Sequence, residues 1–377
     1  MDSCPFPLEV IDLIIGHLHL DLSALKSCAL VCRDWIPSCR THLFRRLQLR
    51  PEGKDSPDNW FQHLSAAPHI VSYIHELAIL CERSSWVSWD PLLPALLTKL
   101  LHLAQIELHG CDLPWLPAPL TSAIYTLFRL PSMKRVQLRL CVLPASCFDL
   151  FGPALEQIAL SDVALERDVT VHVEEQSRTA RPKHLLVEGK HIASMVDCLV
   201  PSPESTQLED LQRLCIKYQG DDADTLDAIE MLLQAAGNLE HLTMGLYPAS
   251  IQSTPTFSTA PSICYNRQLR TLWLSHFDMN RASPTNQLPW LRSLLSRLTP
   301  EHMLQAIAID ARQRPSREAP VLDADGWARV DDVLAGSGLP HLRDVHIRVG
   351  EAFAAGVCQI SASMPALCAR RVLRVTM

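Results

Sequence analysis

Apolar residues recur along most of the chain in short clusters, which are separated by longer segments with helical periodicity. Within a cluster the apolar side chains take alternate positions, which is the pattern of a strand with one buried face. The fullest clusters are Leu103, Ile106, Leu108, Cys111 and Leu113, and Met133, Val136, Leu138, Cys141 and Leu143. Helical patterns fill the intervals at residues 91–101, 122–130, 224–236, 287–298, 326–335 and 351–361. This alternation predicts an α/β fold in which helices connect parallel strands.

The clusters repeat at a nearly constant interval, with their markers at residues 77, 106, 136, 158, 185, 214, 242, 272, 307, 345 and 373. Most steps are about 22 to 30 residues, a period typical of repeat proteins, whose units bury their apolar faces against one another. The full clusters resemble the leucine-rich repeat, and the other copies keep only its strand. The resemblance implies an irregular leucine-rich-repeat solenoid with a parallel sheet over residues 70–377. The alternative is an ordinary α/β domain with a parallel sheet.

The first fifty residues have a different pattern. Leu8, Ile11, Ile15 and Leu18 share one face of a predicted helix, and Val10, Leu13 and Ile14 share another. Two apolar stripes on so short a helix imply burial on both sides. One side would pack within a small module, and the other would need the following domain or a partner. A second helix is predicted after a cap at Asp21 or Ser23, and a third from Pro37 to Leu47.

Four motifs in this stretch occur in the order typical of one family: Pro-Leu-Glu-Val at residues 7–10, Ile-Gly-His-Leu at 15–18, Leu-Val-Cys-Arg-x-Trp at 30–35, and Leu-Phe-Arg-Arg-Leu at 43–47. Residues 1–50 therefore resemble an F-box of the fungal type, a short module of three helices. The resemblance implies docking on the SKP-family adaptor of a cullin-RING (SCF-type) ubiquitin ligase. It assigns the adaptor contacts to Pro7, Leu8, Val10, Ile11, Ile14, Leu30, Val31 and Trp35. Residues 51–69 read as a linker with a short helix near residues 60–64.

The amino-acid composition indicates which classes of protein this chain could belong to. Hydrophobic residues make up 47% and charged residues 20% of the chain, which is typical of a folded protein rather than a disordered one. The net charge of −7 disfavours a general nucleic-acid-binding role. The 13 cysteines include no C-x-x-C pair, so we read them as buried thiols in a reducing compartment. The start lacks the basic region of a signal peptide, and we expect a cytoplasmic or nuclear protein without membrane contact.

No motif for catalysis or cofactor binding is present, because the sequence has no phosphate-binding loop, no G-x-S-x-G and no H-E-x-x-H. We therefore predict a protein that is not an enzyme and binds no cofactor. Cys28, Cys32, Cys39 and His42 could hold zinc in principle. Their spacing matches no known zinc finger, and buried thiols are the simpler reading. Cys111 and Cys141 are predicted to bond backbone groups in the turn after a strand.

Residues that flank the inward-facing leucines of the predicted strands point to the open face of the sheet. Candidate contacts to a protein target there are His109, Arg139, Lys217, Trp273, Asp310 and Arg348. Trp273 is the sharpest candidate, because an exposed aromatic residue is a typical binding anchor. Alternatively, it packs under the predicted loop at residues 247–268. Further loop insertions are predicted at residues 166–182 and 311–322.

These patterns lead to one hypothesis and one alternative. The hypothesis is a substrate receptor of an SCF-type ubiquitin ligase, with the adaptor bound by residues 1–50 and a protein target bound by the repeats. The alternative is a leucine-rich-repeat scaffold or binding protein without a ligase, in which the first helices cap the repeats. The outer stripe of the first helix discriminates between them, because a cap would cover it and a docking module would leave it exposed.

Overall fold

The computed structural model describes residues 7–81, 86–166, 180–200, 208–219, 223–247, 260–280, 286–311, 321–336, 339–350 and 356–377. It divides into two compact units, Met1–Leu155 with Leu165–Ala180, and Glu156–Ala164 with Arg181–Met377. Most of each predicted loop insertion, at residues 166–182, 247–268 and 311–322, lies outside the described residues. The first unit includes both the N-terminal helices and the segment that the sequence predicts as a linker.

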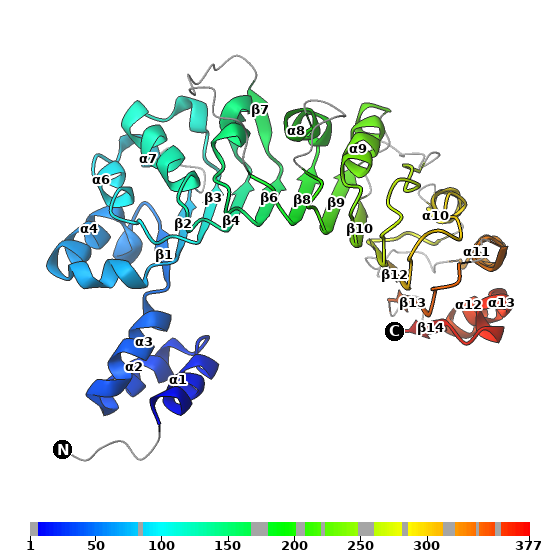
Figure 1. The fold of residues 1–377 in the computed structure, drawn as a ribbon, viewed down its shortest axis with the longest axis horizontal. Helices are drawn as coiled ribbons and strands as arrows, with labels where there is room; N and C mark the ends of the chain where they lie inside the picture. Colours follow the sequence, from blue (N-terminus) through cyan, green and yellow to red (C-terminus); the bar gives the residue numbers. More distant parts are fainter. Residues whose placement is uncertain are drawn as a thin grey trace. The chain divides into compact units, whose positions relative to one another are not determined.

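The first unit begins with helices and continues with alternating strands and helices (Figure 1). Its helices are α1 (Leu8–His17), α2 (Leu22–Val31), α3 (Ile36–Leu43), α4 (Pro57–Ala66), α5 (Trp86–Trp89), α6 (Leu93–Leu97) and α7 (Ala118–Phe128). Short 3-10 turns include η1 (Arg33–Trp35), η3 (Pro68–Tyr73) and η4 (Leu113–Trp115). Its strands are β1 (Arg46–Leu49), β2 (Glu76–Leu80), β3 (Gln105–His109), β4 (Arg135–Arg139) and β5 (Val142–Pro144), and the short β7 (Ala164–Glu166) follows later in the chain.

Strands β1, β2, β3 and β4 pair in chain order and are all parallel. Their buried residues align across the strands, so that Leu77, Ile106 and Val136 form one row and Ile79, Leu108 and Leu138 form the next. The predicted third helix is wrong at its end, because it stops at Leu43 and residues 46–49 form β1 instead. Leu47 and Leu49 are buried while Arg46 and Gln48 are not. This two-residue period suits a strand paired with β2.

The second unit continues the alternation of strands and helices. Its strands are β6 (Gln157–Ser161), β8 (His184–Gly189), β9 (Arg213–Gln219), β10 (His241–Tyr247), β11 (Thr271–Ser275), β12 (Ala306–Ala311), β13 (Asp344–Val349) and β14 (Leu373–Thr376). Its helices are α8 (Ile192–Leu199), α9 (Ala223–Ala235), α10 (Leu288–Leu295), α11 (Ala324–Gly336), α12 (Val357–Ser363) and α13 (Pro365–Ala369). Figure 1 shows α8 and α9 on the same side of strands β8, β9 and β10.

These eight strands form a large parallel sheet in the order β6-β8-β9-β10-β11-β12-β13-β14. One row of apolar residues crosses the whole sheet, formed by Ile158, Leu185, Leu214, Leu242, Leu272, Ile307, Val345 and Leu373. Helices pack beside one another along this side of the sheet. Helix α8 contacts α9, and α11 contacts both α10 and α12. Each of the eleven predicted clusters contains a strand, which confirms the α/β fold and its parallel sheet.

The turns after β2, β3 and β4 each contain a buried cysteine, Cys81, Cys111 and Cys141, and the last two occupy the same position in their turns. The Cys141 thiol donates hydrogen bonds to the carbonyl oxygens of Arg139 at 3.2 Å and Leu108 at 3.4 Å, which confirms its predicted role in the turn. Cys111 lies 3.0 Å from Cys81, sulfur to sulfur. Hydrogen bonds to Cys141 and Cys81, together with burial, raise the pKa of the Cys111 thiol. It therefore stays protonated at neutral pH and acts as a buried polar link between turns.

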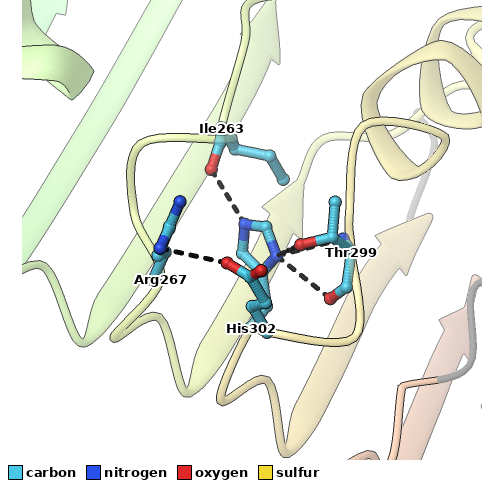
Figure 2. A network of polar contacts seen from close by, with 5 residues as sticks. Ile263, Arg267, Thr299 and His302 are labelled. Carbon is cyan, nitrogen blue, oxygen red and sulfur yellow. Dashed lines mark hydrogen bonds and ion pairs between the residues drawn. The ribbon is translucent and has the colours of Figure 1, made fainter.

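A buried histidine, His302, connects two loops of the second unit through hydrogen bonds (Figure 2). The side chain of His302 is almost fully buried. Its Nδ1 atom accepts a hydrogen bond of 3.0 Å from the backbone N–H of Thr299, so Nε2 carries the hydrogen and donates to the Ile263 carbonyl oxygen at 3.3 Å. Nearby, Arg267 forms an ion pair of 3.0 Å with Glu301. The loop before β11 is thus fixed to the loop before β12.

Replacement of this histidine is expected to destabilise the second unit. His302→Ala removes the acceptor of the Thr299 N–H and one of the two donors to the Ile263 carbonyl, which keeps its hydrogen bond from the Asn266 N–H. The loss of these two hydrogen bonds costs about 1 to 3 kcal/mol. Urea denaturation followed by circular dichroism measures the loss. His191→Ala is the control, since His191 is exposed and makes no capping hydrogen bond at the start of α8. Equal stability of both variants would contradict the structural role of His302.

Candidate partner-binding surface

Helices α1, α2 and α3 enclose a small apolar core of their own. Ile11, Ile15, Leu25 and Cys39 are fully buried in it. Leu18, Cys28, Ala29, Trp35 and Leu43 pack against this core and are partly buried. Burial raises the pKa of the Cys39 thiol, which is consistent with a cysteine that serves as a small apolar residue.

Polar residues fix how these helices start and meet. The Asp21 carboxylate accepts hydrogen bonds from the backbone N–H groups of Ser23 at 3.0 Å and Ala24 at 2.9 Å, which caps α2 as predicted. Pro37 lies in the first turn of α3, where its missing N–H has no cost. The Ser38 hydroxyl donates a hydrogen bond to the Asp12 carboxylate and so joins α3 to α1.

The faces of α1 and α2 that point away from this core remain apolar. Leu8 is 55% exposed and Leu30 is 88% exposed. We call six exposed apolar residues of these two helices the N-terminal apolar surface: Leu8, Val10, Leu13, Ile14, Leu30 and Val31. Apolar side chains in such number on so few residues are unusual for a surface that remains in water, and they mark an interaction site.

An open groove of about 610 Å³ lies along α1 beside this surface, lined by Glu9, Asp12, Leu13, Gly16 and His17. It is polar along one side because Glu9 and Asp12 carry carboxylates. A partner that covers Leu13 would therefore bring a donor or a basic group near Glu9.

Six of the eight adaptor contacts predicted from sequence lie on the surface, namely Pro7, Leu8, Val10, Ile14, Leu30 and Val31. The prediction for Ile11 needs correction, because this side chain is 1% exposed and belongs to the core. Trp35 also packs against the core, and its buried indole N–H has no hydrogen-bond acceptor among the described residues. Leu13, Leu20 and Leu22 are exposed and were missed.

The residues predicted to contact a target lie on the open faces of the strands, some in the first unit and the others in the second. In the first unit, His109 and Arg139 are direct neighbours on β3 and β4. In the second unit, Asp310 and Arg348 are direct neighbours on β12 and β13. Lys217 on β9 forms an ion pair of 3.2 Å with Glu188 on β8, so this lysine already has a partner within the sheet.

Trp273 remains 47% exposed on β11. The described residues therefore leave it uncovered, and most of the loop at residues 247–268 lies outside them. Its neighbours in register are the small residues Thr243 on β10 and Ala308 on β12. The indole ring consequently stands above its surroundings, a position from which it could contact a partner. The alternation of β11 alone predicts this orientation, because Leu272 and Leu274 point into the core.

No protein-family model matches the chain. A search of the curated proteins likewise finds no match.

Residue types that bind metal ions are dispersed through the described part of the chain. Its His, Cys, Asp and Glu side chains form no group of three or more suited to a metal ion. Of the predicted zinc candidates, Cys39 lies in the helical core and the pKa of His42 is lowered by burial and by nearby Arg45. Among the helices described, none is both long and apolar enough to cross a membrane.

Proposed function

We propose that this protein is a non-catalytic substrate receptor of an SCF-type cullin-RING ubiquitin ligase. The N-terminal helices would dock on an SKP-family adaptor, and the strand-bearing part of the chain would hold a protein target. The receptor then raises the effective concentration of the target near the ligase, without making or breaking bonds itself. Such a protein acts in the cytoplasm or the nucleus.

The exposure of the N-terminal apolar surface carries this proposal. The F-box-like motifs and the exposed side chains coincide at Leu8, Val10, Ile14, Leu30 and Val31. Burial of a leucine or isoleucine against a partner contributes about 1.5 to 3 kcal/mol, so these side chains together offset much of the free-energy cost of association. A cap that only covered the repeats would need this stripe to be buried, so its exposure favours docking over the scaffold alternative.

The regular succession of strand, turn and helix supports a leucine-rich-repeat solenoid for the rest of the chain. Strands in both units pair with their neighbours in chain order and keep their buried residues in continuous rows. Leucine-rich repeats of this irregular kind often accompany an F-box. In this proposal the open strand faces, with Trp273 and the pairs His109–Arg139 and Asp310–Arg348, bind the target.

Co-purification with the adaptor tests the proposal directly. The full chain is co-expressed with a tagged SKP-family adaptor, and the complex is analysed by size-exclusion chromatography with light scattering. We expect a stable complex with one copy of each protein. A folded chain that elutes separately from the adaptor at micromolar concentration would refute the receptor function and favour the scaffold alternative.

A further inference from the structure

The turn after β4 contains a leucine in an unfavourable backbone conformation. Leu140 has a φ angle of 52°, which lies in the left-handed region that favours glycine. The matching residue after β3 is Gly110, with a φ of 69°. The Leu140 side chain is 57% exposed, so packing offsets little of this backbone cost. The same position is also left-handed in the turns after β6 and β11, at Asp162 and His276, so the turn requires this conformation and leucine is a costly residue to place there.

A second large apolar residue lies in the adjacent turn. Trp115 in η4 is 72% exposed. The turns after β3 and β4 lie side by side, since Gly110 donates a backbone hydrogen bond of 2.8 Å to Arg139 and Val142 donates one of 3.2 Å to Cys111. Tryptophan is among the residue types that most often dominate the binding energy of protein interfaces, and Leu140 adds exposed apolar area in the neighbouring turn.

The adjoining open face of the strands has an excess of positive charge. Its two carboxylates are both paired, Glu76 with Arg45 at 2.8 Å and Glu107 with Arg46 at 3.0 Å. On β4, Arg135 contacts only the amide of Gln105, at 3.3 Å, and neither Arg135 nor Arg139 forms an ion pair with a residue that the structure describes. The chain as a whole carries a net charge of −7, so this local excess of two arginines is a distinct feature.

We propose that the surface formed by Trp115, Arg135, Arg139 and Leu140, which we call the β4 surface, binds an acidic protein segment that carries a large apolar side chain. The apolar side chain packs on Trp115 and Leu140, and carboxylates pair with the two guanidinium groups of β4. The inference rests on the proposed function and specifies the chemistry of its target. Nucleic acid fits less well as the occupant, because the chain as a whole carries a net charge of −7.

Selection from a random library tests the chemistry without a known target. A phage library of random dodecapeptides is selected on the immobilised full chain, and the enriched sequences are read. We expect enrichment of peptides with net negative charge and at least one Leu, Phe or Trp, whose binding weakens as salt is raised. Enrichment of basic or neutral peptides, no enrichment, or tighter binding of a single-stranded RNA oligonucleotide would overturn the inference.

Variants locate the binding site of the selected peptides by fluorescence polarisation. We expect Trp115→Ala to weaken binding about 10-fold or more and Arg139→Gln about 5-fold. The controls are Tyr265→Ala and Arg343→Gln, which replace an exposed aromatic residue and an exposed arginine of the second unit and should leave affinity unchanged. Weaker binding in the controls, with none in the β4 variants, would place the site elsewhere and refute the proposal.

Leu140→Gly separates binding from folding. Glycine relieves the backbone strain, so the thermal midpoint should stay the same or rise, while peptide affinity falls about 3-fold or more. A lower midpoint with unchanged affinity would show that Leu140 is structural. Adaptor binding is measured on the same variants and should be unaffected. Binding of acidic peptides without binding of the adaptor would refute the ligase function and leave the β4 surface intact. Binding of the adaptor without binding of any acidic peptide would refute only the proposal for the β4 surface.

Discussion

The double variant Leu8→Asp and Leu30→Asp is expected to lose adaptor binding while remaining folded. Leu8 is exposed on α1 and Leu30 is exposed near the end of α2. An interface that covers either one would have to bury an unpaired carboxylate, which is strongly unfavourable. We expect the dissociation constant to rise at least 100-fold, equivalent to about 3 kcal/mol. Isothermal titration calorimetry with the purified adaptor measures the change.

Because both side chains are exposed in the free protein, the thermal midpoint should change little, as is usual for surface substitutions. Leu101→Asp is the matched control, since Leu101 is another exposed leucine of the first unit that lies outside the N-terminal helices. It should bind the adaptor with wild-type affinity. An intact complex with the double variant would mean that this surface is not the docking site.

Much of the fold follows from the period of the apolar residues. Each predicted cluster contains a strand because leucine and isoleucine at alternate positions bury one face, as Ile106 and Leu108 do in β3. The end of the third helix was the main error. Leu43, Phe44 and Leu47 fit a helical spacing, and only pairing with β2 shows that residues 46–49 extend as a strand. Tertiary contacts decide such short segments, and a single segment does not reveal them.

The candidate site could be predicted only in part for a similar reason. The two apolar stripes of α1 are visible in the sequence, but their spacing does not say which one faces inward. The structure assigns Ile11 and Ile15 to the core and leaves Val10, Leu13 and Ile14 exposed. Leu140 was not identified either, because its significance lies in a φ angle that no apolar pattern encodes.

Leu25→Ala is expected to weaken adaptor binding by a different route, through loss of structure. Leu25 is fully buried in a core with only three other fully buried residues. Its truncation costs about 2 to 5 kcal/mol, and so small a module has little stability in reserve. We expect helices α1–α3 to lose protection in hydrogen exchange measured by mass spectrometry. Strands β2 and β3 should stay protected, because their core contains none of the residues that pack around Leu25.

The matched control for Leu25→Ala is Leu30→Ala, which shortens an exposed leucine in the same helix and should change stability by no more than about 0.5 kcal/mol. Excess adaptor binds only the folded helices, so a high adaptor concentration should restore their protection in Leu25→Ala. It should not restore binding in the Leu8→Asp and Leu30→Asp variant, whose helices are folded but whose surface repels the partner. If Leu25→Ala kept full protection of α1–α3 without adaptor, these helices would be held by more than their own small core, and the exposed stripe would need another explanation.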